Sequence, residues 1–169
     1  MKKLLLLFVF GLLFSCEAVG DTNNPGFQIE IDGVTWNAMQ TKAIRNANGT
    51  ILIRASSTNE VFEILIPSAN VGDYVLKSSG TAVATYNYNL DNVNLIYTSY
   101  TTPPTGTVNQ FPSGGSGFIK IRTKPKQDAG TISGELQFQG KQTINNPAFL
   151  ELRNFYRGSF YNIPIEPAP

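Results

Sequence analysis

The acidic residues are the first candidates for chemistry, because two carboxylates are enough to hydrolyse a glycosidic bond. The chain holds twelve of them, scattered along its length. Most fall on the polar side of an alternating segment or in a turn, where a solvated carboxylate is the default. Glu63 is the exception, because Phe62 and Ile64 flank it in an apolar run, where a buried acid could serve as a general acid. A surface glutamate paired with an arginine accounts for the same pattern, and we expect no catalytic residue.

The residue types that the chain lacks exclude further chemistry. Without histidine there is no Ser-His-Asp triad, no Cys-His pair and no His-ligated zinc site. The single cysteine can form neither an intramolecular disulfide nor a thiolate cluster. Asn87, Asn89 and Asp91 place oxygen atoms at alternate positions, but calcium loops usually carry more carboxylates and a tight glycine turn. We therefore expect no metal site and no cofactor.

Aromatic residues near the middle of the chain are the better candidates for binding. Tyr97 and Tyr100 lead into the stretch 101–116, which is rich in Pro, Gly, Ser and Thr, and Phe111 lies within it. Irregular segments of this length are often functional. Tyrosines that pack on their cross-strand neighbours are the competing interpretation. We take Tyr97, Tyr100 and Phe111 as candidate contacts for a glycan or another protein.

The first sixteen residues predict that the chain is secreted and attached to a membrane. An uncharged apolar stretch, Leu4–Phe14, follows a short positive segment. It suits the hydrophobic region of a secretory signal and is short for a membrane-spanning helix. Leu13-Phe14-Ser15-Cys16 then resembles the bacterial lipobox, which implies cleavage before Cys16 and acylation of that cysteine with palmitate-type chains. Such chains would supply a stable membrane anchor.

These features define the expected organisation of the chain. Residues 1–15 are a lipoprotein signal peptide, 16–26 a flexible tether from the acylated cysteine, and 27–169 a single β-domain. The tether has no apolar periodicity. The formal net charge of +1 provides no basic surface for nucleic acid, so we expect none as a partner.

Short alternating segments predict an all-β fold for the domain. Apolar and polar residues alternate in 27–31, 117–123 and 131–139, and Asp32-Gly33 predicts a hairpin. Fifteen Gly and ten Pro punctuate the chain, and we find no long segment with a helical period. We predict an antiparallel β-sandwich or partly open barrel of about 8–10 short strands. The residues expected mostly inside are Trp36, Phe62, Ile64, Phe118, Leu136 and Phe138.

Several segments together resemble the small outer-membrane lipoproteins of unknown function from Bacteroidota. They are FQIEIDGVTWNA (27–38), GDYVL (72–76), GFIKIRTK (117–124), GTISGELQF (130–138) and RNFYRGSFYNIP (153–164). The resemblance covers most of the chain after Cys16. It implies a lipid-anchored location in the cell envelope, at the outer membrane, and it implies no reaction.

The expected function is therefore a non-enzymatic binding or structural role in the envelope. The membrane is contacted through the lipid anchor, and a glycan or an envelope protein is the partner. The alternative is a carboxylate-dependent, glycosidase-like hydrolase. An enzyme of that kind needs two acids facing each other about 5–9.5 Å apart in a concave site.

Substitution of the lone cysteine tests the anchor. The Cys16→Ser variant should take up no labelled palmitate and should accumulate as uncleaved or soluble protein, because the acylated sulfur is gone. Metabolic labelling and membrane fractionation measure both effects. A variant that still incorporates palmitate and pellets with membranes would contradict the lipoprotein interpretation.

Overall fold

The computed structural model describes residues 26–80, 82–91, 93–103, 111, 114–123, 128–144 and 149–169. This part of the chain contains eleven strands and no helix, and so no helix able to cross a membrane. The strands are β1 (Phe27–Ile31), β2 (Val34–Asn37), β3 (Gln40–Arg45), β4 (Ile51–Ser56), β5 (Glu60–Ile66), β6 (Gly72–Leu76), β7 (Val83–Leu90), β8 (Val93–Ser99), β9 (Gly117–Ile121), β10 (Thr131–Gln142) and β11 (Leu152–Pro167). The predicted segment 1–26, with Cys16, falls outside the described residues except for Gly26.

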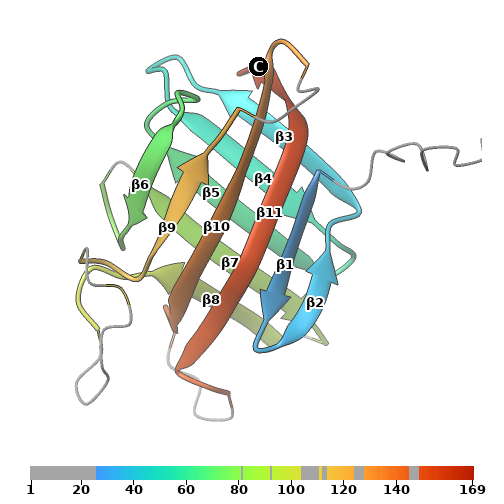
Figure 1. Ribbon diagram of the computed structural model, residues 1–169. Coiled ribbons are helices and arrows are strands. Elements are labelled where there is room, and N and C mark those ends of the chain that lie inside the picture. Colours follow the sequence, from blue (N-terminus) through green and yellow to red (C-terminus); the bar gives the residue numbers. More distant parts are fainter. Residues whose placement is uncertain are drawn as a thin grey trace, which may run out of the picture.

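The strands form two layers that face each other across the core. One layer has the order β2-β1-β11-β10-β9-β6, and the other has the order β3-β4-β5-β7-β8. Figure 1 shows the first layer in front, with its strands crossing those of the second at a large angle. This arrangement resembles the orthogonal packing in which strands at the corners pass from one layer to the other. The all-β prediction is confirmed.

Two long strands join the layers into a barrel. The last residues of β10 pair with β8, and the last residues of β11 pair with β3. The strands β3, β4, β5, β7, β8, β10 and β11 thereby form a closed ring, from which β1–β2 and β9–β6 extend as lateral additions. The β11–β3 pair is parallel, whereas the other pairs among the described strands are antiparallel.

Irregular residues in β11 allow that strand to bend between the layers. Its register against β10 shifts twice, and the shifts fall at Arg157 and Asn162. Both residues have a positive φ, 49° and 56°, which is the conformation of the extra residue in one class of β-bulge. Asn162 is held there because its side-chain oxygen accepts from Thr131 Oγ1 and its backbone N–H donates to Ser133 Oγ. A bulge bends a strand and increases its twist.

The β1–β2 hairpin follows directly from its sequence. Asp32 and Gly33 both have positive φ, 49° and 89°, as a two-residue hairpin turn of the type favoured by Asp-Gly requires. Ile31 pairs with Val34 across this turn, and Ile29 pairs with Trp36. The predicted hairpin is confirmed.

Aromatic rings fill the space between the layers. Phe62 lies at the centre, with the rings of Phe27, Trp36, Tyr86 and Phe155 all within about 5.5 Å of it, centroid to centroid. Five of the six predicted core residues are buried, namely Trp36, Phe62, Ile64, Leu136 and Phe138. Phe118 is only half-buried, because it alternates with Ile119 and Ile121 and so lies on the other face of β9. It packs there against Phe111 and Lys120.

Truncation of Phe138 tests the packing of this core. Phe138 is fully buried and stacks on Phe155 with ring centroids 4.4 Å apart. Phe138→Ala should lower the free energy of unfolding by about 3–5 kcal/mol, because it removes a large side chain from a closed space. Urea denaturation measures the change, and Phe118→Ala is the matched control with a smaller loss. A cost at Phe138 below about 0.5 kcal/mol would contradict the observed register.

Candidate functional site

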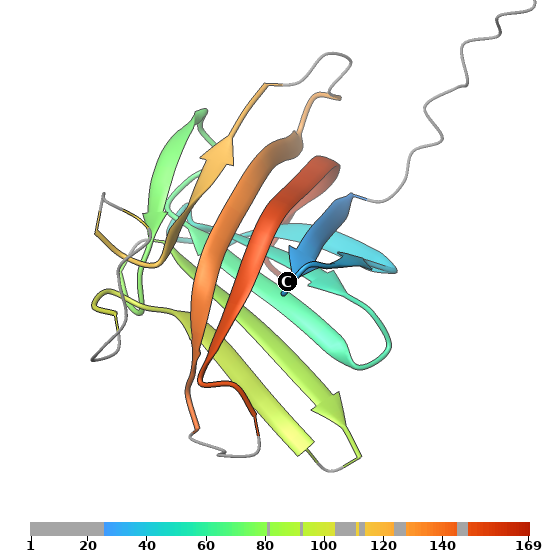
Figure 2. The ribbon, with the colours of Figure 1, turned by 60° about the horizontal axis from the view of Figure 1, so that its bottom comes forward.

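A hollow opens between the layers where the β1–β2 hairpin faces the start of β5 and the end of β7. Its volume is about 310 Å³. We call this hollow the mouth. It is lined by Ile31, Asp32, Val34, Thr35, Trp36, Glu60, Tyr86 and Arg153. The turn of the β1–β2 hairpin, which borders the mouth, lies at the lower end of the molecule in Figure 1, and that end comes forward in Figure 2.

Glu60 is the polar centre of the mouth. Its carboxylate accepts from the Trp36 indole N–H at 2.5 Å, from the Ser57 hydroxyl at 2.8 Å and from the Tyr86 hydroxyl at 2.6 Å. The donors belong to β2, to the turn between β4 and β5, and to β7. One carboxylate therefore fixes elements of both layers, and hydrogen bonds to a charged group are stronger than neutral ones.

The hydrogen bond to Glu60 also changes the chemistry of Tyr86. The pKa of the Tyr86 hydroxyl lies far above its ordinary value, because the ring is buried and because its hydroxyl donates to the Glu60 carboxylate. Tyr86 therefore stays neutral and serves as a donor. It is not a residue that readily gives up its proton.

Arg153 and Asp32 form the second polar pair of the mouth. Arg153 Nε lies 3.4 Å from Asp32 Oδ2 and has no hydrogen-bond partner, although this atom is buried. The guanidinium also lies 5.4 Å from the centre of the Tyr97 ring. Asp32 accepts a hydrogen bond from the backbone N–H of Asn154 at 2.9 Å. The tip of the hairpin is thus fastened to β11 beside the mouth.

Large apolar side chains are exposed around this end of the molecule. Val34, Leu90, Ile144 and Leu150 are 72%, 39%, 63% and 65% exposed. Val34 begins β2, Leu90 ends β7, Ile144 follows β10 and Leu150 precedes β11. These strand ends lie at the lower end of Figure 1. We call these four residues the rim. Val34 is the one of the four that lines the mouth itself.

The three aromatic residues proposed as ligand contacts lie inside the protein. Tyr97, Tyr100 and Phe111 are 0%, 5% and 5% exposed, so none offers an open ring face. The Tyr97 hydroxyl donates to the Leu150 carbonyl at 3.0 Å, and the Tyr100 hydroxyl donates to Gln139 Oε1. Burial raises the pKa of the Tyr100 hydroxyl. The structure corrects the earlier interpretation, because the polar end of each tyrosine is satisfied within the protein. Most of the stretch 101–116 lies outside the described residues.

The other polar residues singled out from the sequence stand apart from the mouth. Glu63 lies on the outer face of β5, 3.6 Å from Arg54 Nε, and both side chains are nearly half exposed. This agrees with the interpretation of Glu63 as a surface glutamate paired with an arginine, and not with that of a buried general acid. Asn87 is half-buried on β7, whereas Asn89 and Asp91 are exposed.

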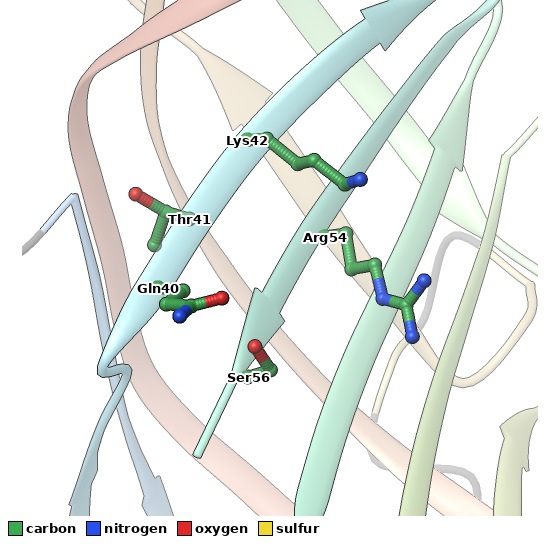
Figure 3. Close-up of a pocket in the computed structure, with 5 residues that line it drawn as sticks. All are labelled: Gln40, Thr41, Lys42, Arg54 and Ser56. Carbon is green, nitrogen blue, oxygen red and sulfur yellow. The ribbon is translucent and has the colours of Figure 1, made fainter.

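A second hollow, of about 300 Å³, lies on the outer face of β3 and β4. Gln40, Thr41, Lys42, Arg54 and Ser56 line it (Figure 3). Lys42 and Arg54 extend from neighbouring strands, and Arg54 already faces Glu63. Exposed charges of this kind interact weakly because water screens them. The mouth, which has buried polar groups and an apolar rim, is the stronger candidate.

Comparison with known proteins places the chain in a family. A family model described as a domain of unknown function, DUF6252, matches residues 23–164. The chain belongs to the DUF6252 family. Searches of curated proteins and of solved structures return no match. The match spans the described chain from before β1 into β11, so the mouth and the closing strands are both part of the DUF6252 domain.

Sequence reasoning did not find the centre of the DUF6252 mouth. Trp36 was expected in the core, but Glu60 and Tyr86 carried no signal of their own. Glu60 follows a polar turn, where a solvated acid is the default. Its partners Trp36 and Tyr86 are 24 and 26 residues away, so only the pairing of strands brings them together.

The raised pKa of Tyr86 predicts how stability depends on pH. The unfolded tyrosine ionises near pH 10, whereas the folded one resists ionisation. Its contribution is therefore fully present below about pH 10 and is lost as the pH rises above that value. Between pH 10 and 11.5, the free energy of unfolding should fall more steeply in wild type than in Tyr86→Phe, by about 1.4 kcal/mol per pH unit. Equal slopes in denaturant titrations would contradict the raised pKa of Tyr86.

Proposed function

We propose that this protein is a lipid-anchored, non-enzymatic binding module of the cell envelope that meets its ligand at the mouth. The observation that carries the proposal is a hollow that combines the hydrogen-bonded polar groups of Glu60 and Tyr86 with the exposed apolar side chain of Val34 on its lining. Pockets that bind ligands commonly combine apolar walls with a few fixed polar groups.

The direction of β1 supports the proposed orientation. β1 begins at Phe27, next to the expected tether, and ends at Ile31 beside the mouth. Figure 1 shows the chain entering β1 at the end of the strand that lies away from the hairpin turn. A domain attached through Cys16 would therefore have its point of attachment at the end of β1 opposite the mouth. The lipobox and the resemblance to Bacteroidota lipoproteins support the anchor.

The hydrogen bonds at the mouth favour binding over hydrolysis. A glycosidase needs one acid with a proton to give and a second whose oxygen is free to attack. Glu60 accepts three hydrogen bonds from the protein, and Asp32 accepts one from Asn154 and faces Arg153. Both carboxylates thus serve as acceptors that fix the walls of the mouth.

Site-directed photocrosslinking in cells tests this function. A photoreactive phenylalanine analogue at Val34, on the rim, should form covalent adducts with a partner. The same analogue at Val71 is the matched control, because Val71 is similarly exposed (64% against 72%) and precedes β6, far from the mouth. Adducts at Val34 that are absent at Val71 are the expected result. Equal labelling at both positions, or none at Val34, would contradict a ligand site at the mouth.

A further inference from the structure

The outer edge of β2 borders the mouth, and no strand among the described residues pairs with its backbone groups. β2 is the terminal strand of its layer, with β1 as its neighbour on one side and no described strand on the other. The backbone N–H of Ala38 donates to the Phe27 carbonyl at 3.0 Å, which fixes the alternation of hydrogen bonds along the hairpin. Hydrogen-bonded positions alternate along an antiparallel pair. The backbone N–H and C=O groups of Val34 and Trp36 therefore point toward β1, and those of Thr35 and Asn37 point away from it.

This edge lacks the usual protection against strand addition. Exposed edges are commonly blocked by charged residues, by proline or by bulges. β2 has the sequence VTWN, which contains neither a charged residue nor a proline. Its pairing with β1 has no register shift and therefore no bulge. The opposite terminal strand, β6, carries Asp73 in a 2.7 Å ion pair with Arg122. Short length is the main protection that β2 retains.

The position of the edge links it to the mouth. Val34, Thr35 and Trp36 belong both to β2 and to the lining of the hollow. A strand that paired with Thr35 and Asn37 would lie about 4.8 Å from β2, and every second side chain would point to the face on which Trp36 lies. Those side chains would enter the mouth from its open side.

The charges of the mouth indicate which side chain fits there. The opposite charges of Asp32 and Arg153 cancel, so the Glu60 carboxylate gives the lining of the mouth a formal net charge of −1. A lysine or arginine complements that charge, and Val34 offers an apolar contact beside it.

We propose that the ligand of this site is an extended peptide segment that adds as a strand to the outer edge of β2 and places a lysine or arginine in the mouth. Strand addition of this kind draws affinity from backbone hydrogen bonds and specificity from alternate side chains. The inference rests on the proposed function and names its ligand class.

Peptide selection on the full-length protein in detergent micelles tests the inference. A phage library of random twelve-residue peptides should yield binders that share a Lys or Arg. Thr35→Pro removes an outward N–H and no bond to β1, and it should weaken these binders by about tenfold or more. Thr35→Val keeps the N–H and is the matched variant, so the loss of affinity in Thr35→Pro beyond that in Thr35→Val measures the backbone hydrogen bond.

Methylated peptides provide a second measurement that does not depend on folding of the proline variant. Methylation of backbone nitrogens should abolish binding at alternate residues and be tolerated at the residues between them, because only every second N–H faces β2.

Four outcomes would overturn the inference. They are a library with no binders, binders that tolerate Thr35→Pro, binders without a basic residue, and wild-type protein that dimerises through β2 in sedimentation experiments while Thr35→Pro stays monomeric. The last would assign the edge to a second copy of the chain. Adducts at Val34 without peptide binders would refute only the claim that the ligand is a peptide, and the proposed binding site would stand. Absence of adducts at Val34 would refute the proposed function itself.

Discussion

Closure of the barrel by β11 is the constraint on which the other features depend. This strand bonds to β10 on one side and to β1 and then β3 on the other, so one segment of chain holds both layers. A strand that serves two layers must bend, and the bulges at Arg157 and Asn162 provide the bend. Gly134 pairs with Phe160 and leaves space for its ring. A Cβ atom at position 134 would lie only 2.5 Å from that ring.

The mouth is a consequence of that closure. β11 carries Arg153 next to Asp32, and its pairing with β1 places the hairpin over the start of β5. Trp36 can then reach across to Glu60 in the other layer, whose carboxylate also accepts a hydrogen bond from Tyr86 on β7 of its own layer. The same carboxylate that completes the hydrogen bonds of two buried rings therefore also gives the hollow its charge. Buried polar groups that are satisfied in this way make a core rigid and specify its arrangement.

Local sequence signals predicted much of the fold. Alternation located β1, β9 and most of β10, and Asp32-Gly33 located the first hairpin, because each of these depends on neighbouring residues. β3 was missed, since QTKAIR has Ala43 as its only fully buried residue and owes its place to pairing with β4 and the distant β11. Phe118 was assigned to the wrong face because its size outweighed the alternation around it.

The candidate site was less predictable, for a physical reason. Burial of Tyr97 depends on a hydrogen-bond partner 53 residues away, the Leu150 carbonyl, so a tyrosine that looked available is satisfied internally. Glu60 shows the converse, since an acid that looked solvated becomes the centre of the mouth. Polar residues acquire their roles from partners that only the topology supplies.

The order of the strands also sets the order of events during synthesis. The bonds that tie the hairpin to β11 span 122 residues between Asp32 and Asn154 and 127 between Glu30 and Arg157. A ribosome delivers β1 first and its partner last, so no nascent chain that stops short of residue 152 can seat the hairpin or close the ring. Folds dominated by such distant pairings form in milliseconds to seconds, slowly for a domain of this size. Because β1 pairs with the last strand, the chain can reach its native state only after β11 has been synthesised.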